Sequence, residues 1–363
     1  MVRHGDDSEN LLGRVCEAVG CGQPLLIQGS GSKAFYTGPC EALPLPDRGP
    51  GQVSTLAHTG IVHYEPTELV LTARSGTPLA AIETLLAESG QMLGFEPPHF
   101  GPGATWGGTV ACGLSGPRRP WGGSVCDAVL GCRIVNGRGE ALSFGGEVMK
   151  NVAGFDVSRL MAGALGTLGL LLEISVKVLP RPECETTRCF EWSLADARKR
   201  MVQWGASGLP VTGMAWDGRL YLRLAGPERA VSAAARRAGG DPMAPAEAFW
   251  NGLREQTHGF FYGVGDLWRL SVPPAADIVS LPGEWLVDWG GAQRWLRTAD
   301  AYPFEVFAAA HAVGGHARLF RAADPGAMRC APLAPALAAL QRRVKSAFDP
   351  AGIFNRGLWP EAS

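Results

Sequence analysis

Three glycine-rich clusters between Pro98 and Gly169 constrain what this chain can fold into more than any other feature. They read Gly101-Pro102-Gly103-Ala104-Thr105-Trp106-Gly107-Gly108-Thr109 and on to Gly113-Leu114-Ser115-Gly116, then Asn151-Val152-Ala153-Gly154-Phe155-Asp156, then Gly166-Thr167-Leu168-Gly169. Glycine permits positive φ and close approach of a ligand, and its exposed N–H groups can hold phosphate or ring oxygens. A tight turn explains any single glycine, but the three clusters together predict a bound ligand.

Length and charge narrow the class of protein. At 363 residues the chain is longer than one ordinary core, so we expect two domains with a further short segment. The net charge of −1 and the pI near 6.7 give no electrostatic basis for binding nucleic acid or an anionic membrane. The 49 glycines and 27 prolines indicate a turn-rich α/β or α+β fold rather than a helical bundle.

Targeting and metal signals are absent from the sequence. The first ten residues contain no apolar core of a signal peptide, and no apolar run is long enough to span a membrane. The nine cysteines form no Cys-x-x-Cys pair, and neither Cys16 with Cys21 nor Cys184 with Cys189 has iron–sulfur spacing. We therefore expect reduced thiols in the cytoplasm and no metal site.

A first glycine loop follows an expected strand near the amino terminus. Hydrophobic spacing predicts a helix over residues 10–20 and a strand over 24–27, which runs into Gln28-Gly29-Ser30-Gly31-Ser32. A strand, then Gly-x-Gly, then a small hydroxyl residue is the order expected where a pyrophosphate meets backbone amides. The third glycine of the Rossmann fingerprint is missing, so that fold is not indicated.

Periodicity predicts the remaining elements. In the first part they are strands over residues 61–64, 69–73, 91–95, 128–136, 140–144 and 168–179 and helices over 79–89 and 158–165. After Pro180-Arg181-Pro182 we expect strands over 187–192, 213–217, 219–225, 267–272, 285–289 and 317–320, and helices over 194–204, 228–238 and near Gln293. A helix over 335–348 begins the tail. The expected domains are residues 1–182, 183–321 and 322–363.

Several motifs together resemble the FAD-binding domain of the vanillyl-alcohol-oxidase, or PCMH-type, superfamily. They are Gly29–Ser32, Gly103–Thr109, Lys150–Asp156, Gly166–Gly169 and the carboxyl-terminal Phe348–Asn355. Within it, Gly116–Gly123 and Gly314–Arg321 resemble the FAD-binding second subunits of bacterial glycolate oxidases, and the resemblance covers nearly the whole chain. It implies an α+β fold: a PCMH-type FAD-binding domain of two α/β subdomains, a smaller α/β cap, and a carboxyl-terminal segment returning to the first domain.

The resemblance also implies a set of cofactor-binding residues. Gly29–Ser32 would hold the pyrophosphate of FAD, Thr105, Gly107, Gly108, Ser115 and Gly116 would line the ribityl and isoalloxazine region, and Ile174 would meet the adenine. The full set is Gly29, Ser30, Gly31, Ser32, Pro102, Gly103, Ala104, Thr105, Gly107, Gly108, Gly113, Ser115, Gly116, Gly166, Thr167, Leu168, Gly169 and Ile174. A chain without a basic cluster must bind both phosphates largely through backbone donors.

Two departures from the superfamily pattern bear on how FAD is held. Many members attach FAD through a histidine in the first glycine loop, and here that loop has none, so we predict dissociable, non-covalent FAD. Cys112 and Cys126 stand in no recognised attachment motif. Where the superfamily pattern has an arginine before Asp127, this chain has Cys126.

Candidate catalytic residues are few. Oxidation of a 2-hydroxy acid needs a base for the hydroxyl proton and a cation for the carboxylate, and His316 and Arg318 are the candidates. The alternative for His316 is a structural histidine, and His99 is a weaker candidate base. The spacing of His311 and His316 does not suggest zinc.

The resemblance thus implies an FAD-dependent subunit that takes part in oxidising glycolate or a similar small 2-hydroxy acid to glyoxylate or a 2-oxo acid. Its partners would be a larger flavin-containing catalytic subunit and an iron–sulfur subunit, to which it relays electrons. Its location would be the cytoplasm, or the inner membrane surface through those partners. Two alternatives stand: a self-sufficient FAD oxidoreductase with His316 as base, and an assembly subunit with a degenerate flavin pocket.

Overall fold

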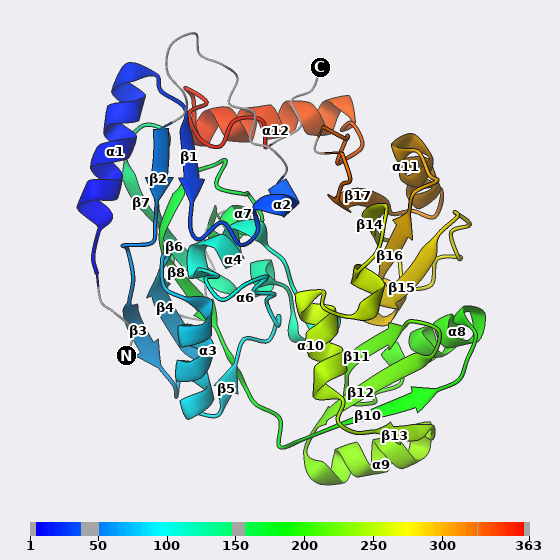
Figure 1. The fold of residues 1–363 in the computed structure, drawn as a ribbon. Helices are drawn as coiled ribbons and strands as arrows, with labels where there is room; N and C mark the ends of the chain where they lie inside the picture. Colours follow the sequence, from blue (N-terminus) through cyan, green and yellow to red (C-terminus); the bar gives the residue numbers. More distant parts are fainter. Residues whose placement is uncertain (1–4, 38–50, 147–156, 325, 359–363) are drawn as a thin grey trace. The chain divides into compact units, whose positions relative to one another are not determined.

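The computed structural model describes residues 5–37, 51–146, 157–324 and 326–358. The motif Lys150–Asp156 lies outside the described residues. The chain divides into two compact units (Figure 1). Unit 1 comprises residues 1–114, 124–180 and 332–363, and unit 2 comprises residues 115–123 and 181–331. Unit 2 is therefore built mainly from one long insertion between two segments of unit 1.

Unit 1 is organised around an antiparallel five-stranded sheet in the order β3-β4-β8-β6-β7. These strands span Ile61–Glu65, Val70–Arg74, Leu170–Lys177, Val129–Val135 and Ala141–Gly145 respectively. The β6–β7 hairpin turns at Asn136, whose side-chain oxygen accepts hydrogen bonds from the N–H groups of Arg138 and Glu140. This turn confirms the hairpin predicted from Asn136-Gly137.

Helices cover this sheet through one hydrophobic core. They are α3 (Leu79–Glu88), α4 (Trp106–Cys112), α6 (Val125–Ala128) and α7 (Val157–Met161). Leu79, Ile82 and Leu86 place the apolar stripe of α3 in the core, as its spacing predicts. A two-stranded ladder joins β5 (Gln91–Met92) to β9 (Leu179–Pro180).

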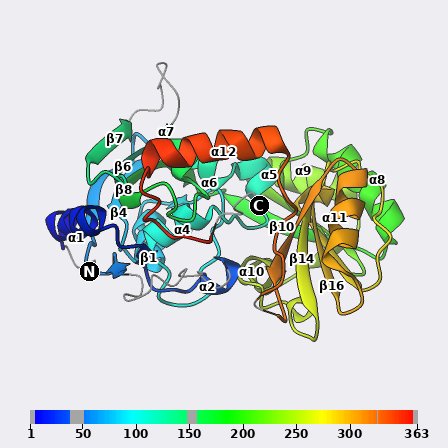
Figure 2. The ribbon, with the colours of Figure 1, turned by 90° about the horizontal axis from the view of Figure 1, so that it is seen from above.

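A second, smaller core of unit 1 brings together the two ends of the chain. Strand β1 (Leu25–Gln28) pairs in parallel with β2 (Gly51–Ser54), and α1 (Ser8–Cys21) packs beside them. The ribbon shows α12 (Pro335–Phe348) leading into the carboxyl-terminal tail (Figures 1 and 2). Beyond this helix, Ile353 and Phe354 complete the core, and Phe354 forms a parallel bridge with Leu25. The strand that leads into the first glycine loop therefore lies between β2 and the carboxyl-terminal tail.

Unit 2 is an eight-stranded sheet in the order β13-β10-β12-β11-β15-β16-β14-β17. In chain order its strands are β10 (Cys184–Phe190), β11 (Val211–Trp216), β12 (Leu220–Gly226), β13 (Asp241–Met243), β14 (Asp266–Ser271), β15 (Glu284–Asp288), β16 (Gln293–Thr298) and β17 (His316–Arg321). Its helices are α5 (Arg119–Gly122), α8 (Leu194–Gly205), α9 (Glu228–Ala238), α10 (Glu247–Glu255) and α11 (Pro303–Ala312), with short 3-10 turns at Gly259–Phe261 and Trp289–Gly291.

Residues 115–123 join unit 2 through specific contacts. The indole N–H of Trp289 donates to the Gly116 carbonyl at 3.0 Å, and Arg118 forms an ion pair with Glu185 at 2.8 Å. The guanidinium of Arg119 lies 4.5 Å from the ring centre of Trp289. These contacts hold Ser115 and Gly116 in a different unit from the other predicted flavin residues.

The helix expected near Gln293 is wrong. Residues Gln293–Thr298 form β16, a strand between β15 and β14 in which all six residues are buried. Both arginines of this strand are buried and hydrogen-bonded to carbonyls of other segments. The guanidinium of Arg294 donates to the Ala276 carbonyl, and that of Arg297 donates to the Phe260 carbonyl. Otherwise the mixture of antiparallel sheets and helices confirms the α+β class.

Candidate functional site

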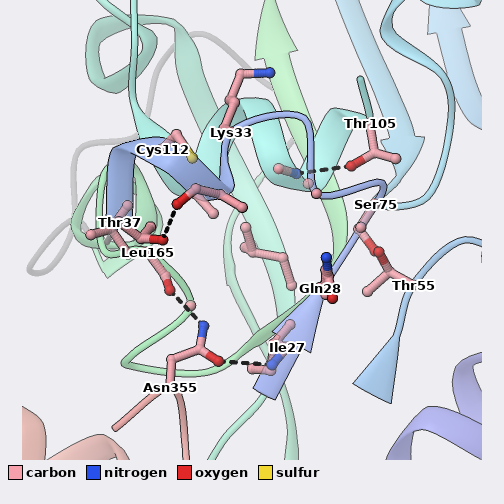
Figure 3. A pocket seen from close by; sticks show the side chains of 18 of the residues that line it. Ile27, Gln28, Lys33, Thr37, Thr55, Ser75, Thr105, Cys112, Leu165 and Asn355 are labelled. Carbon is pink, nitrogen blue, oxygen red and sulfur yellow. Dashed lines mark hydrogen bonds between the residues drawn. The ribbon is translucent and has the colours of Figure 1, made fainter. Parts of the chain in front are cut away.

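A pocket of about 1100 Å³, its open mouth included, lies in unit 1 (Figure 3). Six segments of unit 1 line it: residues 26–37 with the glycine loop, Thr55 after β2, Ser75 after β4, Thr105 with α4, the turn before β8 with the start of that strand, and the carboxyl-terminal tail. The lining is mostly apolar, and Lys33 is the one charged residue among the described lining residues. A concave, largely apolar pocket with a few polar groups is typical of a cofactor site.

The first wall is the loop Gly29–Ser32. Among the described residues, nothing accepts a hydrogen bond from the backbone N–H groups of these four residues. Gly31 adopts φ +76°, which favours glycine. Consecutive backbone N–H groups without protein acceptors make an anion-binding concavity.

The second wall is made by Ser75 and the start of α4. Gly107 approaches so closely that a Cβ on it would lie 2.6 Å from the Ser75 Cβ, and its N–H donates to the Ser75 carbonyl at 2.7 Å. Thr105 caps α4 by accepting from the Gly108 N–H. The Ser75 hydroxyl is buried and has no hydrogen-bond partner among the described residues. This hydroxyl oxygen is available to a ligand.

The third wall is the turn that precedes β8. Leu165 and Gly166 both adopt positive φ, at 54° and 69°. Asn355, from the tail, contacts this turn: its side-chain N–H donates to the Leu165 carbonyl at 2.7 Å, and its side-chain oxygen accepts from the Ile27 N–H at 2.7 Å (Figure 3). One side chain therefore joins β1 to the turn.

Lys33 lies at the end of the glycine loop. Its side chain is 6% exposed, and its ammonium donates to the His99 carbonyl at 3.2 Å. The His99 ring lies 2.9 Å from the Glu83 carboxylate. Lys33 is thus a cation at the pocket, and His99 is not among the pocket-lining residues.

The structure brings together half of the predicted cofactor-binding residues. Those lining the pocket are Gly29, Ser30, Gly31, Ser32, Thr105, Gly107, Gly108, Gly166 and Gly169. Pro102, Gly103, Ala104, Gly113, Thr167, Leu168 and Ile174 belong to unit 1 without lining it. Ile174 is fully buried in β8, and the Thr167 hydroxyl donates to the Ala164 carbonyl.

Ser115 and Gly116, the remaining predicted pair, belong to unit 2, where the Ser115 hydroxyl is buried without a partner among the described residues. Sequence reasoning missed a second group of lining residues: Leu26, Ile27, Gln28, Lys33, Ala34, Thr37, Thr55, Ser75, Ala111, Cys112, Leu165, Leu170, Leu171, Asn355 and Leu358. A sequence signal exists for those that stand inside or next to a glycine-rich or carboxyl-terminal motif, namely Gln28, Lys33, Ala111, Cys112, Leu165 and Asn355.

The candidate catalytic pair lies on β17, in unit 2. Arg318 is the cross-strand neighbour of Arg269 on β14, and His316 is the neighbour of Ser271. Arg269 and Arg321 each place their guanidinium carbon 5.6 Å from the ring centre of Phe320. Three arginines, Arg269, Arg318 and Arg321, therefore lie near one another on β14 and β17. Desolvation and the nearby Arg269 cation lower the pKa of His316, which leaves the ring neutral at neutral pH.

The structure holds no group of three or more potential metal-ligating side chains within its described residues. Within the same residues, none of the helices has the length and apolar character needed to cross a membrane.

Comparison with known proteins assigns the family. Residues 5–145 match the family described as FAD binding domain. The chain is 49% identical over 358 residues to the glycolate oxidase subunit GlcE of Escherichia coli, covering 98% of both chains. The chain belongs to the GlcE family. It is an FAD-binding oxidoreductase of the PCMH-type superfamily, as the sequence motifs predicted.

Two further relatives match over part of their length. The glycolate oxidase subunit GlcD of Bacillus subtilis is 30% identical over 181 residues, which cover 49% of this chain and 37% of that protein. The mitochondrial D-lactate dehydrogenase [cytochrome] 1 of Saccharomyces cerevisiae is 28% identical over 155 residues, covering 42% and 26%.

A solved structure of alkyldihydroxyacetonephosphate synthase superposes with a TM-score of 0.67 over 98% of this GlcE-family chain and 75% of that protein. The sequence identity is 15%, so this likeness shows the fold alone.

Proposed function

We propose that the pocket of unit 1 binds FAD without a covalent bond, and that the chain is the FAD-binding subunit of a glycolate-oxidase-type complex. In that complex it takes part in oxidising glycolate, or a similar 2-hydroxy acid, to glyoxylate or the 2-oxo acid. The 49% identity to a glycolate oxidase subunit over 98% of the chain carries the assignment.

The lining residues fit the chemistry of FAD. The N–H groups of Gly29–Ser32, which have no acceptor among the described residues, suit a pyrophosphate, and Lys33 adds a cation at the end of that loop. The orphaned Ser75 hydroxyl and the glycines of α4 suit a polar, close-fitting part of the cofactor. A Cβ on Gly29 would lie 2.4 Å from the Thr105 hydroxyl oxygen, so only glycine lets the loop pack against the start of α4.

When bound, FAD accepts the hydride that the 2-hydroxy acid loses. The chain's own residues bind and orient. His316, whose pKa partial desolvation and Arg269 lower, can accept the hydroxyl proton, and Arg318, beside Arg269, can hold the carboxylate in a charge-assisted hydrogen bond. These two roles are part of the proposal.

Non-covalent binding is supported by the lining residues. No histidine stands among the described residues that line the pocket. Cys112 does line the pocket, so its thiol is the side chain that must be tested as a site of covalent attachment to FAD. We expect acid to release all flavin from both the wild type and Cys112→Ala.

The partners belong to the proposal as well. The relatives' names describe subunits of glycolate oxidase, and we infer for this chain a larger flavin-containing catalytic subunit and an iron–sulfur subunit as partners. The chain would then act in the cytoplasm or at the inner membrane surface through these partners.

An absorbance spectrum of the purified chain before and after acid precipitation tests the cofactor, and anaerobic addition of glycolate tests the reaction. A yellow protein that releases its flavin and stays oxidised with glycolate supports a subunit that relays electrons. Bleaching by glycolate would instead show a self-sufficient oxidoreductase, and His316→Ala would then abolish the bleaching. A colourless chain that FAD cannot reconstitute would overturn the proposal in favour of an assembly role.

A further inference from the structure

Asn355 connects segments of unit 1 that are far apart in sequence. Its side-chain oxygen accepts from the Ile27 N–H at 2.7 Å, and its side-chain N–H donates to the Leu165 carbonyl at 2.7 Å. Its backbone N–H donates to the Leu25 carbonyl at 2.9 Å. The residue is 4% exposed and lines the pocket (Figure 3).

The fit around Asn355 is close. A Cβ on Gly166 would lie 2.7 Å from the Asn355 side-chain nitrogen. Leu165 adopts φ +54°, a conformation that side-chain-bearing residues rarely take unless their surroundings enforce it. The hydrogen bond from Asn355 to the Leu165 carbonyl is such an enforcing contact.

Lys345 fixes the same turn at a second point. Its ammonium donates to the Thr167 carbonyl and to the Asp349 carboxylate, both at 2.6 Å, and to the Phe354 carbonyl at 3.2 Å. The buried Asp349 carboxylate in turn accepts from the N–H groups of Ile353 and Phe354. We call Lys345 and Asn355 the tail clamp, because both belong to the carboxyl-terminal segment and both bind carbonyls of the Leu165–Gly169 turn.

The tail clamp acts on two walls of the pocket at once. Ile27 directly precedes Gln28 and the glycine loop, while Leu165 begins the opposite turn. Asn355 sets the spacing between these walls, because one rigid amide binds the backbone of both. Without that amide, the buried Leu165 carbonyl and the half-buried Ile27 N–H lose their partners, and the turn loses a restraint on its positive φ.

We propose that Asn355 is a positioning residue for the cofactor: the tail clamp holds the walls of the pocket at the separation that receives FAD. This inference rests on FAD binding in the pocket. It adds that the affinity for FAD depends on a side chain of the tail, through its hydrogen-bond donor to Leu165.

The test is Asn355→Asp, titrated with FAD by the quenching of flavin fluorescence from pH 8 to pH 5. At pH 8 the carboxylate only accepts, so it faces the Leu165 carbonyl without a donor, and we expect FAD to bind about ten- to a hundredfold more weakly than in the wild type. As pH falls, the carboxyl group takes up a proton and regains a donor, so the ratio of the two dissociation constants should fall. Asn251→Asp, the same change in unit 2, is the matched control and should follow the wild type.

Thermal unfolding of each apoprotein accompanies the titration. A ratio of the Asn355→Asp and wild-type dissociation constants near one at every pH would overturn the inference. A loss of FAD affinity that is the same at every pH and accompanies a lower unfolding temperature would also overturn it. If Asn355→Asp does not fold, Asn355→Ser replaces it in the titration, because serine introduces no charge. Wild-type FAD affinity in Asn355→Ser would overturn the inference. Weaker FAD binding by a folded Asn355→Ser apoprotein would support it. Failure of the wild type to bind FAD would instead count against the proposed function.

Discussion

Gly29 and Thr105, which both line the pocket, pack so closely against each other that a Cβ on Gly29 would lie 2.4 Å from the Thr105 hydroxyl oxygen. That hydroxyl caps α4 by accepting from the Gly108 N–H at 3.3 Å. The glycine loop and the start of α4 therefore constrain each other's position.

Gly29→Ala should weaken FAD binding and lower stability by about 1–3 kcal/mol, because the added methyl group must displace the capping hydroxyl. FAD titration and urea unfolding measure the two effects. Gly205→Ala is the control, since a Cβ at this helical position meets nothing within 4 Å. Wild-type FAD affinity in Gly29→Ala would contradict the expectation that the close packing of Gly29 against Thr105 shapes the pocket.

Asp349→Ala should destabilise unit 1 by about 3–5 kcal/mol, because it removes the buried partner of Lys345 and the acceptor for two backbone N–H groups. Urea unfolding followed by tryptophan fluorescence gives the free energy. The exposed Asp241 on β13 provides a matched Asp→Ala control. A loss below about 1 kcal/mol would show that the tail is held by its apolar contacts alone.

His58 should make stability depend on pH. It is fully buried, and its Nδ1 accepts from the Asp7 N–H at 3.1 Å. Desolvation holds its pKa below the ordinary 6.5, although the Asp6 carboxylate opposes this shift. The unfolded chain therefore binds the proton first, and stability falls as pH drops through 6.5.

We expect the wild type to lose more stability than His58→Asn between pH 7.5 and pH 5.5, with a difference of up to about 1.4 kcal/mol per pH unit below 6.5. Asparagine can keep an acceptor near the Asp7 N–H without titrating. Urea unfolding at three pH values measures how the free energy of unfolding changes with pH. His63→Asn, at an exposed position of β3, is the comparison variant. Parallel slopes in the wild type and His58→Asn would exclude His58 as the titrating group.

Arg318→Gln should weaken binding of glycolate or another small carboxylate by about tenfold or more, because it removes a charge-assisted hydrogen bond. The flavin content should stay at the wild-type level, since Arg318 lies in unit 2 and the pocket in unit 1. Difference spectra of the flavin under anaerobic titration report carboxylate binding. Arg229→Gln, on the exposed face of α9, is the control, and equal affinities in both variants would remove Arg318 from the site.

Local signals in the sequence predicted much of the fold. Helices α9 and α12 begin and end at the predicted residues, and Asn136-Gly137 marked the β6–β7 hairpin. The helix predicted near Gln293 is strand β16, whose two buried arginines donate to carbonyls of other segments. A hydrogen bond between segments that are distant in sequence leaves no periodic pattern of hydrophobic residues from which it could be predicted.

In the candidate site, too, local sequence signals predicted some residues, while contacts between distant segments decided the others. The glycine loop and the start of α4 were predicted, since glycine and small hydroxyl residues signal close approach in their own sequence. Ser75 was missed because its importance arises only where Gly107 packs against it. Ile174 does not line the pocket, because its side chain lies fully buried in β8, and its contact with the cofactor stays a prediction.

The discontinuity of unit 1 sets an order of events during synthesis. Residues 181–331 are translated before Lys345 and Asn355, so a nascent chain that has completed unit 2 still lacks the side chains that join β1 to the Leu165–Gly169 turn. Domains usually form from the amino terminus onward as the chain emerges. The contacts of Lys345 and Asn355 form only after the tail has been translated, so, on the proposed function, FAD would bind after synthesis of the chain is complete.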